Sequence, residues 1–144
     1  MAVSTIPAAK DALYDLIVAD ASVVAAKVQV SYGWPSPHQA RELIWIGDVE
    51  GEQNAAALGK QRREETYTMT LKVDVLREGN DQKSASERAF VIAGWIENIL
   101  RNDATMGGVV RTAEIEGPLG LKESATDKAR NSVVTLSIYC TARI

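Results

Sequence analysis

Two long stretches of alternating apolar and polar residues constrain the fold of this chain more than any other feature of its sequence. Apolar residues occupy every second position from Thr66 to Val75, and the same period returns from Val134 to Ile144. The apolar positions are Tyr67, Met69, Leu71, Val73 and Val75 in the first stretch, and Val134, Leu136, Ile138, Cys140, Ala142 and Ile144 in the second. A period of two places such side chains on one face of a strand. We therefore predict two half-exposed strands of an antiparallel sheet.

Two further segments carry apolar residues at helical spacing. The first helix is predicted from about Pro7 to Asp20, on the stripe Ala9, Ala12, Leu13, Leu16 and Ile17. The second is predicted to begin at a capping box, Ser84 with Glu87 three residues later, and to end near Asn102. Its stripe comprises Ala85, Ala89, Ile92, Ala93, Ile96, Ile99 and Leu100. Each stripe is typical of a helix that packs against a sheet.

Weaker patterns complete the predicted order of elements, α-β-β-β-α-β-β. They predict strands over 24–32, 43–46 and 109–116, a loop over 33–37, and a polar loop over 117–131. Residues 48–64 show no periodicity, which is typical of either a functional arm or a flexible loop, and we expect a long mobile loop there. The prediction is a single α+β domain over residues 1–144, with a mainly antiparallel or mixed five-stranded sheet and two helices packed on one face. Leu71, Val73, Leu136 and Ile138 should be nearly fully buried beneath Leu16, Ile92 and Ile96.

The composition excludes several functional classes. The chain has 144 residues, 46% of them hydrophobic and 24% charged, with a formal net charge of −3. That balance fits a soluble globular protein and argues against a dedicated nucleic-acid binder. One cysteine excludes an intrachain disulfide and a cysteine-based zinc site. No apolar run reaches the roughly 18–20 residues of a membrane span, and residues 1–10 do not resemble a signal peptide.

Candidates for catalysis or ligand binding are few. His38 is the only histidine, and a lone histidine in a loop is usually a solvated surface residue. Cys140 falls on the apolar face of the last strand, which favours a small buried hydrophobe over a nucleophile. The Gly117–Gly120 segment fits no phosphate-binding loop, and the acidic residues of 48–52 lack the spacing of a calcium loop. We expect no enzyme, no cofactor and no metal site.

Several surface features instead favour contact with other subunits. Trp34 stands between Gly33 and Pro35 in a loop, where its ring needs cover from its own domain or from a partner. Arg62 and Arg63 belong to the only basic cluster, with Lys60, and Glu64 and Glu65 follow at once and neutralise it. The outward positions of the long strands are uncharged: Thr66, Thr68, Thr70, Thr135, Ser137, Tyr139 and Thr141. Exposed strands usually carry charges that resist pairing, although strand propensity alone also selects such residues. The candidate interface residues are Trp34, Arg62, Arg63, Thr68, Thr70 and Tyr139.

The order and spacing of these elements resemble the tail terminator (tail completion) proteins of long-tailed bacteriophages. The likeness spans nearly the whole chain: an amphipathic helix, a strand, the Gly33-Trp34-Pro35 loop, the apolar strand Leu43–Ile46, a long polar loop leading into Glu65–Met69, and a helix containing Ala89, Trp95, Ile96 and Leu100. It rests on order and spacing, since the family has no catalytic motif.

The resemblance implies an α+β subunit of a hexameric ring in the virion, at the head-proximal end of the tail, assembled in the host cytoplasm. Such a ring caps the tail tube, ends its polymerisation and presents a surface to the head. The implied partners are further copies of this chain, the tail tube protein and a head-completion protein, without a membrane or sequence-specific nucleic acid. Three alternatives stay open: a head-closure or neck connector protein, a small-molecule-binding α+β domain, and an enzyme that uses His38.

Overall fold

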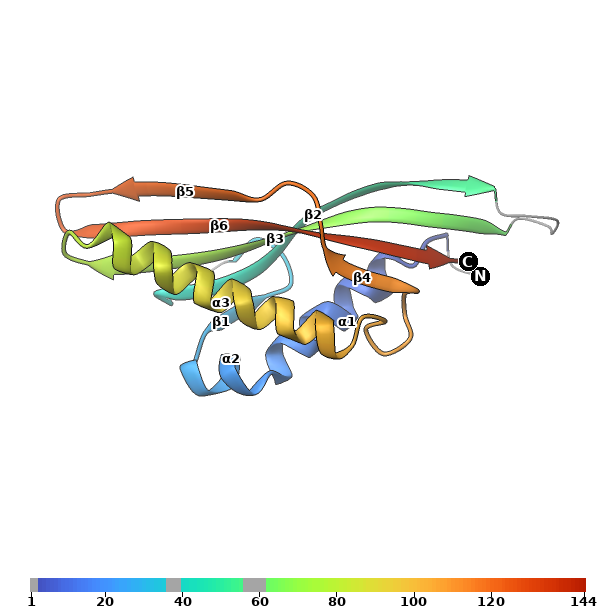
Figure 1. Ribbon diagram of the computed structural model, residues 1–144, viewed down its shortest axis with the longest axis horizontal. Helices are drawn as coiled ribbons and strands as arrows, with labels where there is room; N and C mark the ends of the chain where they lie inside the picture. The colour runs from blue at the N-terminus through green and yellow to red at the C-terminus, as the bar shows by residue number, and fades with distance from the viewer. Residues whose placement is uncertain (1–2, 36–39, 56–61) are drawn as a thin grey trace.

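The two long alternating strands lie side by side at the centre of a six-stranded sheet (Figure 1). The computed structural model describes residues 3–35, 40–55 and 62–144. Its strands are β1 Gln29–Ser31, β2 Glu42–Ala55, β3 Arg63–Glu78, β4 Thr112–Ile115, β5 Gly120–Ala125 and β6 Ala129–Arg143. The order across the sheet is β1-β2-β3-β6-β4, and β5 also pairs with β6. Within the described residues, β1 is parallel to β2 and the other pairs are antiparallel.

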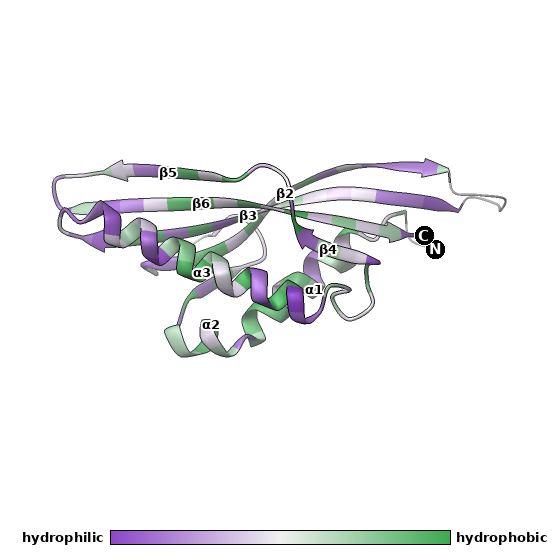
Figure 2. Ribbon diagram, viewed as in Figure 1, coloured by the Kyte–Doolittle hydropathy of each residue, from purple (hydrophilic) through white to green (hydrophobic). Residues whose placement is uncertain are grey.

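The described residues form three helices, all on one side of this sheet, and we call the opposite face, which none of these helices covers, the open face (Figure 1). The helices are α1 Ile6–Ala19, α2 Ala21–Ala26 and α3 Gln82–Asn102. Figure 2 shows hydrophilic and hydrophobic bands alternating along α3, as expected when one side of a helix packs on a sheet. The predicted α+β class, with helices on one face of a mixed sheet, is confirmed.

The core lies between the helices and the inward side chains of β3 and β6. Leu71, Val73 and Ile138 are fully buried, and Leu136 is 5% exposed, as predicted from the alternation. Ile92 and Ile96 of α3 are fully buried as well, whereas Leu16 of α1 is only half-buried at the margin of the core. The predicted strand register is therefore right.

The prediction of two helices and one strand over 24–32 is wrong, because a short third helix occupies most of that segment. The side chain of Asp20 accepts hydrogen bonds from the backbone N–H groups of Ser22 and Val23 and so caps α2. Lys27 ends that helix in the left-handed conformation, with φ of 56°. Only the three residues of β1 remain extended.

The prediction of a loop over 48–64 is also wrong in most of its length. β2 continues to Ala55 and β3 begins at Arg63, while residues 56–61 lie outside the described residues. We call residues 48–55 and 63–69, the part of this hairpin beyond a bulge between Ile46 and Val49, the arm. Its β2 half is exposed except at Val49, so it lacks the apolar alternation that reveals a strand in the sequence. Backbone pairing with β3 holds it in place.

A sixth strand lies where the sequence predicted a loop over 117–131. β5 is almost wholly exposed and forms a hairpin with β6, closed by Thr126, whose N–H donates to the carbonyl of Ala129. The strand predicted over 109–116 shortens to β4. The predicted capping box also differs, because Asp81 caps α3 by accepting from the N–H of Ser84.

Candidate subunit interface

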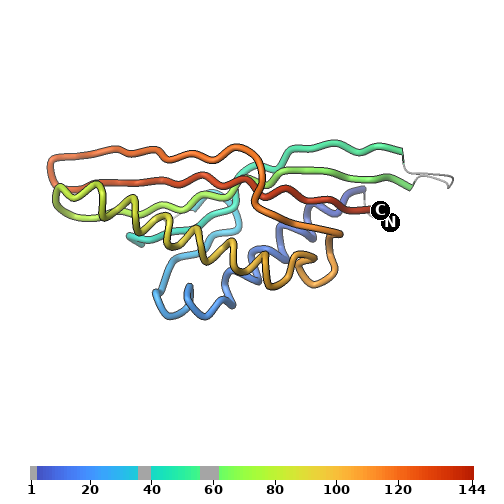
Figure 3. Tube along the Cα trace, viewed as in Figure 1, coloured from blue at the N-terminus to red at the C-terminus, as the bar shows by residue number. Residues whose placement is uncertain are grey.

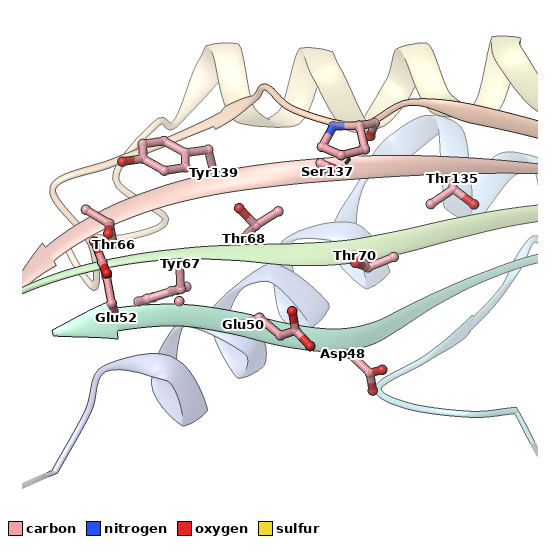
Figure 4. Close-up of a pocket in the computed structure, with 12 residues that line it drawn as sticks. Asp48, Glu50, Glu52, Thr66, Tyr67, Thr68, Thr70, Thr135, Ser137 and Tyr139 are labelled. Carbon is pink, nitrogen blue, oxygen red and sulfur yellow. Dashed lines mark hydrogen bonds between the residues drawn. The ribbon is translucent and has the colours of Figure 1, made fainter.

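The open face contains a shallow groove of about 750 Å³ over the middle strands β2, β3 and β6 (Figure 4). Its floor consists of hydroxyl-bearing residues from the two central strands: Thr66, Thr68, Thr70, Thr135, Ser137 and Tyr139. Most of these are half-buried, and Ser137 is covered further because its hydroxyl donates to the carbonyl of Pro118 at 2.6 Å. The uncharged outward face predicted from the sequence is thus a continuous surface.

Three carboxylates line one side of this groove. Asp48, Glu50 and Glu52 project from β2 on the same face as the threonines (Figure 4). No lysine or arginine lines the groove in the part of the chain that the structure describes. A neutral floor with an acidic margin suits a protein surface that brings hydrogen-bond donors and positive charge. No group of three or more metal-ligating side chains gathers among the described residues.

Trp34 lies at the margin of the same face, on the edge of the sheet next to β1 and β2. Its ring meets that of Trp45 edge to face, with centroids 5.6 Å apart, yet Trp34 remains 80% exposed. A second hollow at this edge is lined by Trp34 and shares Asp48 and Thr70 with the central groove. The fold therefore gives Trp34 support on one side only.

Tyr32 continues this exposed edge. The Nζ of Lys10 lies 4.4 Å from the centroid of the Tyr32 ring, and Tyr14 packs against it edge to face. Tyr32 is 42% exposed. Tyr32 and Trp34 together give this edge an exposed aromatic surface. Tyrosine and tryptophan are enriched among the residues that contribute most of the binding energy of protein interfaces.

Arg62 and Arg63 lie apart from the groove, at the far end of the arm. Arg62 is exposed, whereas Arg63 is half-buried and its Nη2 donates to the carbonyl of Val3 at 3.2 Å. Among the described residues, the buried Nε of Arg63 has no hydrogen-bond partner. Lys60 and His38 lie outside the described residues.

Within the described residues, Glu64 and Glu65 form no ion pair with Arg62 or Arg63 of the preceding basic cluster. Glu64 forms its ion pairs with Arg143 and Arg111, and the hydrogen bond from Arg143 lowers the pKa of Glu64. β6 pairs with β3, and β4 pairs with β6 on its other side, so these partners come from distant parts of the sequence.

Glu65 is the polar centre that sequence reasoning missed. It is only 2% exposed and faces the helices, where it accepts hydrogen bonds from the Ser4 hydroxyl (2.6 Å), the N–H and hydroxyl of Thr5 (2.7 and 2.8 Å) and the Gln53 amide (2.8 Å). Burial alone would raise the pKa of Glu65, but these bonds outweigh it and lower the pKa. The sequence did contain a sign of this centre. Glu65 lies two residues before Tyr67 and four before Met69, so the alternation places its charge on the inward face of β3.

Two neighbours of this centre are held in their neutral forms. The Tyr67 hydroxyl lies 2.8 Å from that of Thr5, and burial raises the pKa of Tyr67 to about 12. Burial likewise raises the pKa of Cys140 to about 12, and the residue is fully buried. The interpretation of Cys140 as a small core residue is confirmed.

In the parts of the chain that the structure describes, no helix is long and apolar enough to cross a membrane.

Comparison with known proteins shows a likeness of fold. The chain superposes on a chain of the virion of native gene transfer agent (GTA) particle with a TM-score of 0.56 at 12% sequence identity. The alignment covers 98% of this chain and 100% of that chain. No protein-family model and no curated protein sequence matches. This chain therefore shares its fold, over nearly its whole length, with a chain of that virion.

Proposed function

We propose that this chain is a structural protein of a virion and that it acts as a tail terminator. In this role it forms a ring on the end of the tail tube, stops tube polymerisation and provides the surface that joins the head. The observation that carries the proposal is the likeness of fold to a chain of the GTA virion, over 98% of this chain and 100% of that chain. The resemblance in element order to tail terminators points to the same role.

The exposed surfaces described above support a function carried out through protein contacts. A groove with a neutral floor and an acidic margin lies on the open face, and a largely exposed tryptophan lies at the edge of that face. Thr68, Thr70 and Tyr139 of the groove and Trp34 at the edge are the proposed contacts with other subunits, and Arg62 reaches outward from the arm.

A stopper has to close on itself. Subunits that join through two different patches form either an open helix or a closed ring, and an open helix would itself keep growing. A closed ring presents identical surfaces toward one side, which suits a symmetric tube end. We propose a hexamer that contacts the tail tube protein on one side and a head-completion protein on the other, within the virion.

Deletion of the gene from its phage tests the role. We expect overlong tube polymers without heads in electron micrographs, and normal tails again when a plasmid supplies the intact gene. Tails of normal length beside heads that leak their DNA would contradict the terminator role and indicate head closure instead.

A substitution in the groove tests the proposed contact surface. Thr68→Arg places a bulky cation on the floor of the groove and should reduce complementation of the deletion at least tenfold. Val91→Arg, on an exposed position of α3, is the matched control and should complement fully. Equal complementation by both variants would show that the groove is not a contact surface.

A further inference from the structure

The strand registers place two exposed apolar patches at opposite ends of one row of the sheet. Ser31 of β1 pairs with Trp45, and Trp45 pairs with Lys72. Lys72 pairs with Thr135, which in turn pairs with Gly120 of β5. The start of β5 is therefore level with the end of β1, on the opposite edge of the same sheet.

One end of this row is the aromatic edge, Tyr32 and Trp34. These residues follow β1 directly and are 42% and 80% exposed. Contacts with Tyr14, Lys10 and Trp45 support them from behind and leave outward surface on both rings.

The other end is the aliphatic edge, formed by Leu119 and Leu121 with Phe90 of α3 beside them. Leu119 and Leu121 are 65% and 43% exposed, and Phe90 of α3 is 44% exposed. The Ser86 hydroxyl donates to Glu123 at 3.0 Å, which fixes the side of β5 that faces α3. Leu121 precedes Glu123 by two residues and Phe90 follows Ser86 by one helical turn, so both lie on that same side.

Strand direction makes the two edges compatible. β1 is parallel to β2, and the successive antiparallel pairs from β2 to β5 leave β1 and β5 running in opposite directions. Rotation about an axis along the strands preserves their directions, so β1 of one copy would meet β5 of the next as an antiparallel neighbour. In the part of the chain that the structure describes, β1 stands at the end of the strand order, next to β2, and β5 pairs with β6.

The two edges carry one complementary pair of charges, and it lies on the helix side. On the open face the charges are mixed, because Lys10 and Lys72 line the hollow of Trp34 together with Asp48, and Lys122 projects from β5. On the helix side, Lys10 accompanies the aromatic edge and Glu123 the aliphatic edge. A two-fold contact between like edges would instead bring Asp48 toward Asp48 and Lys10 toward Lys10.

We infer that successive copies of this chain dock head to tail, with the aromatic edge of one copy on the aliphatic edge of the next. The inference rests on the proposed ring and names the two surfaces that close it. In this contact the neighbouring copy buries the Trp34 ring, which the subunit alone leaves largely exposed.

Native mass spectrometry of matched variants tests the surfaces. Trp34→Ser and Leu119→Ser should each lower the association constant of the subunits at least tenfold, whereas Trp34→Phe should keep most of it. Val91→Ser, which removes a 49% exposed apolar side chain of α3 outside both edges, is the control and should assemble like the parent chain. Circular dichroism and thermal unfolding verify that every variant is folded.

Crosslinking between copies tests the pairing itself. Gly33→Cys and Lys122→Cys are made separately, because a Cβ at Gly33 meets nothing within 4 Å and Cys140 is buried. A short bismaleimide should link subunits only when the two variants are mixed. A mixture of Gly33→Cys with Lys83→Cys, on an exposed position of α3, serves as the control.

The outcomes separate this inference from the proposed function. Intact rings in Trp34→Ser and Leu119→Ser, with no link in the mixed sample, would overturn the edge contact and leave the ring standing. A parent chain that stays monomeric at the highest concentrations would overturn the ring and the edge contact together. A link confined to the mixture of Gly33→Cys with Lys122→Cys supports the head-to-tail contact.

Discussion

A single carboxylate ties the beginning of α1 to the sheet. Glu65 accepts four hydrogen bonds, three of them from Ser4 and Thr5, which precede the helix. Thr5 occupies the N-cap position of α1 without a side-chain capping bond. The β3 carboxylate therefore takes the place of a local cap, and its negative charge lies at the favourable end of the helix.

The lowered pKa of Glu65 predicts a specific dependence of stability on pH. Because the folded-state pKa lies below the ordinary value of 4.5, the carboxylate stabilises the fold above about that pH, and the contribution is lost as the pH falls through the folded-state pKa. Glu65→Gln should lower the free energy of unfolding at pH 7 by about 1–3 kcal/mol. Urea unfolding at several pH values checks this, and the variant should lose less stability than the parent between pH 5 and pH 3. A parallel loss in both proteins would assign the acid sensitivity to other groups.

Leu136 tests the core at the level of one side chain. It lies on β6, paired with Leu71 of β3, and is 5% exposed, so Leu136→Ala removes buried methyl groups and leaves a cavity. We expect a loss of about 2–5 kcal/mol in the free energy of unfolding, measured by chemical denaturation. A loss well below 1 kcal/mol would show that the site collapses or that its packing is loose.

At the scale of elements, Gly51 allows the two strands of the arm to approach closely. A Cβ at Gly51 would lie 2.1 Å from the Thr66 carbonyl oxygen and 2.5 Å from the Tyr67 Cα, so the two strands approach too closely for a side chain there. Gly51→Ala should therefore destabilise the protein by about 1–3 kcal/mol. Gly94→Ala in α3 meets nothing within 4 Å and should stabilise it by about 0.5–1 kcal/mol. Thermal unfolding of both variants checks the contrast, and shifts of the same sign would contradict it.

Exchange of backbone amides tests how firmly the arm is held. No helix covers the open face, and β2 residues 48–55 are exposed apart from Val49, so their amides should exchange faster in a dilute monomer than those of 71–75. Assembly should slow that exchange if neighbouring subunits order the arm. Equal protection of both segments in the monomer would show that the arm is as rigid as the core.

Burial explains which elements the sequence predicted and which it did not. The sequence predicted β3, β6, α1 and α3 because each of these elements buries one side and so carries a periodic pattern of apolar residues. The same alternation in β3 and β6 also predicted the polar, uncharged residues of the open face. β5 and the β2 half of the arm are exposed on both sides, so backbone pairing forms them and their side chains give little signal. α2 was predicted as a strand because apolar and polar residues alternate after Asp20. In the structure the helix cap that Asp20 provides prevails over that alternation. Glu65 was missed because Ser4 and Thr5, which donate three of its four hydrogen bonds, are some sixty residues distant in the chain.

At the scale of the whole molecule, assembly should appear in the thermal stability. Subunits that bind only in their folded form shift the folding equilibrium by mass action, so the midpoint of thermal unfolding should rise with protein concentration. Scanning calorimetry over a hundredfold range of concentration measures this. Trp34→Ser should flatten the dependence, whereas Val91→Ser should leave it unchanged. A constant midpoint in the parent chain would argue against self-association.

The place of β6 in the sheet determines when the protein can fold during its synthesis. β6 is the last strand to be translated, yet it lies between β3 on one side and β4 and β5 on the other, and the trace of Figure 3 shows how it closes the sheet. Until residues 129–143 leave the ribosome, β3 has no neighbour on the side where β6 will pair, and β4 and β5 have no partner strand. The apolar side of α3 also lacks the β6 side chains against which it packs. Nascent chains halted before β6 should therefore be sensitive to protease and bound by chaperones, and the domain should fold only after residues 129–143 have left the ribosome.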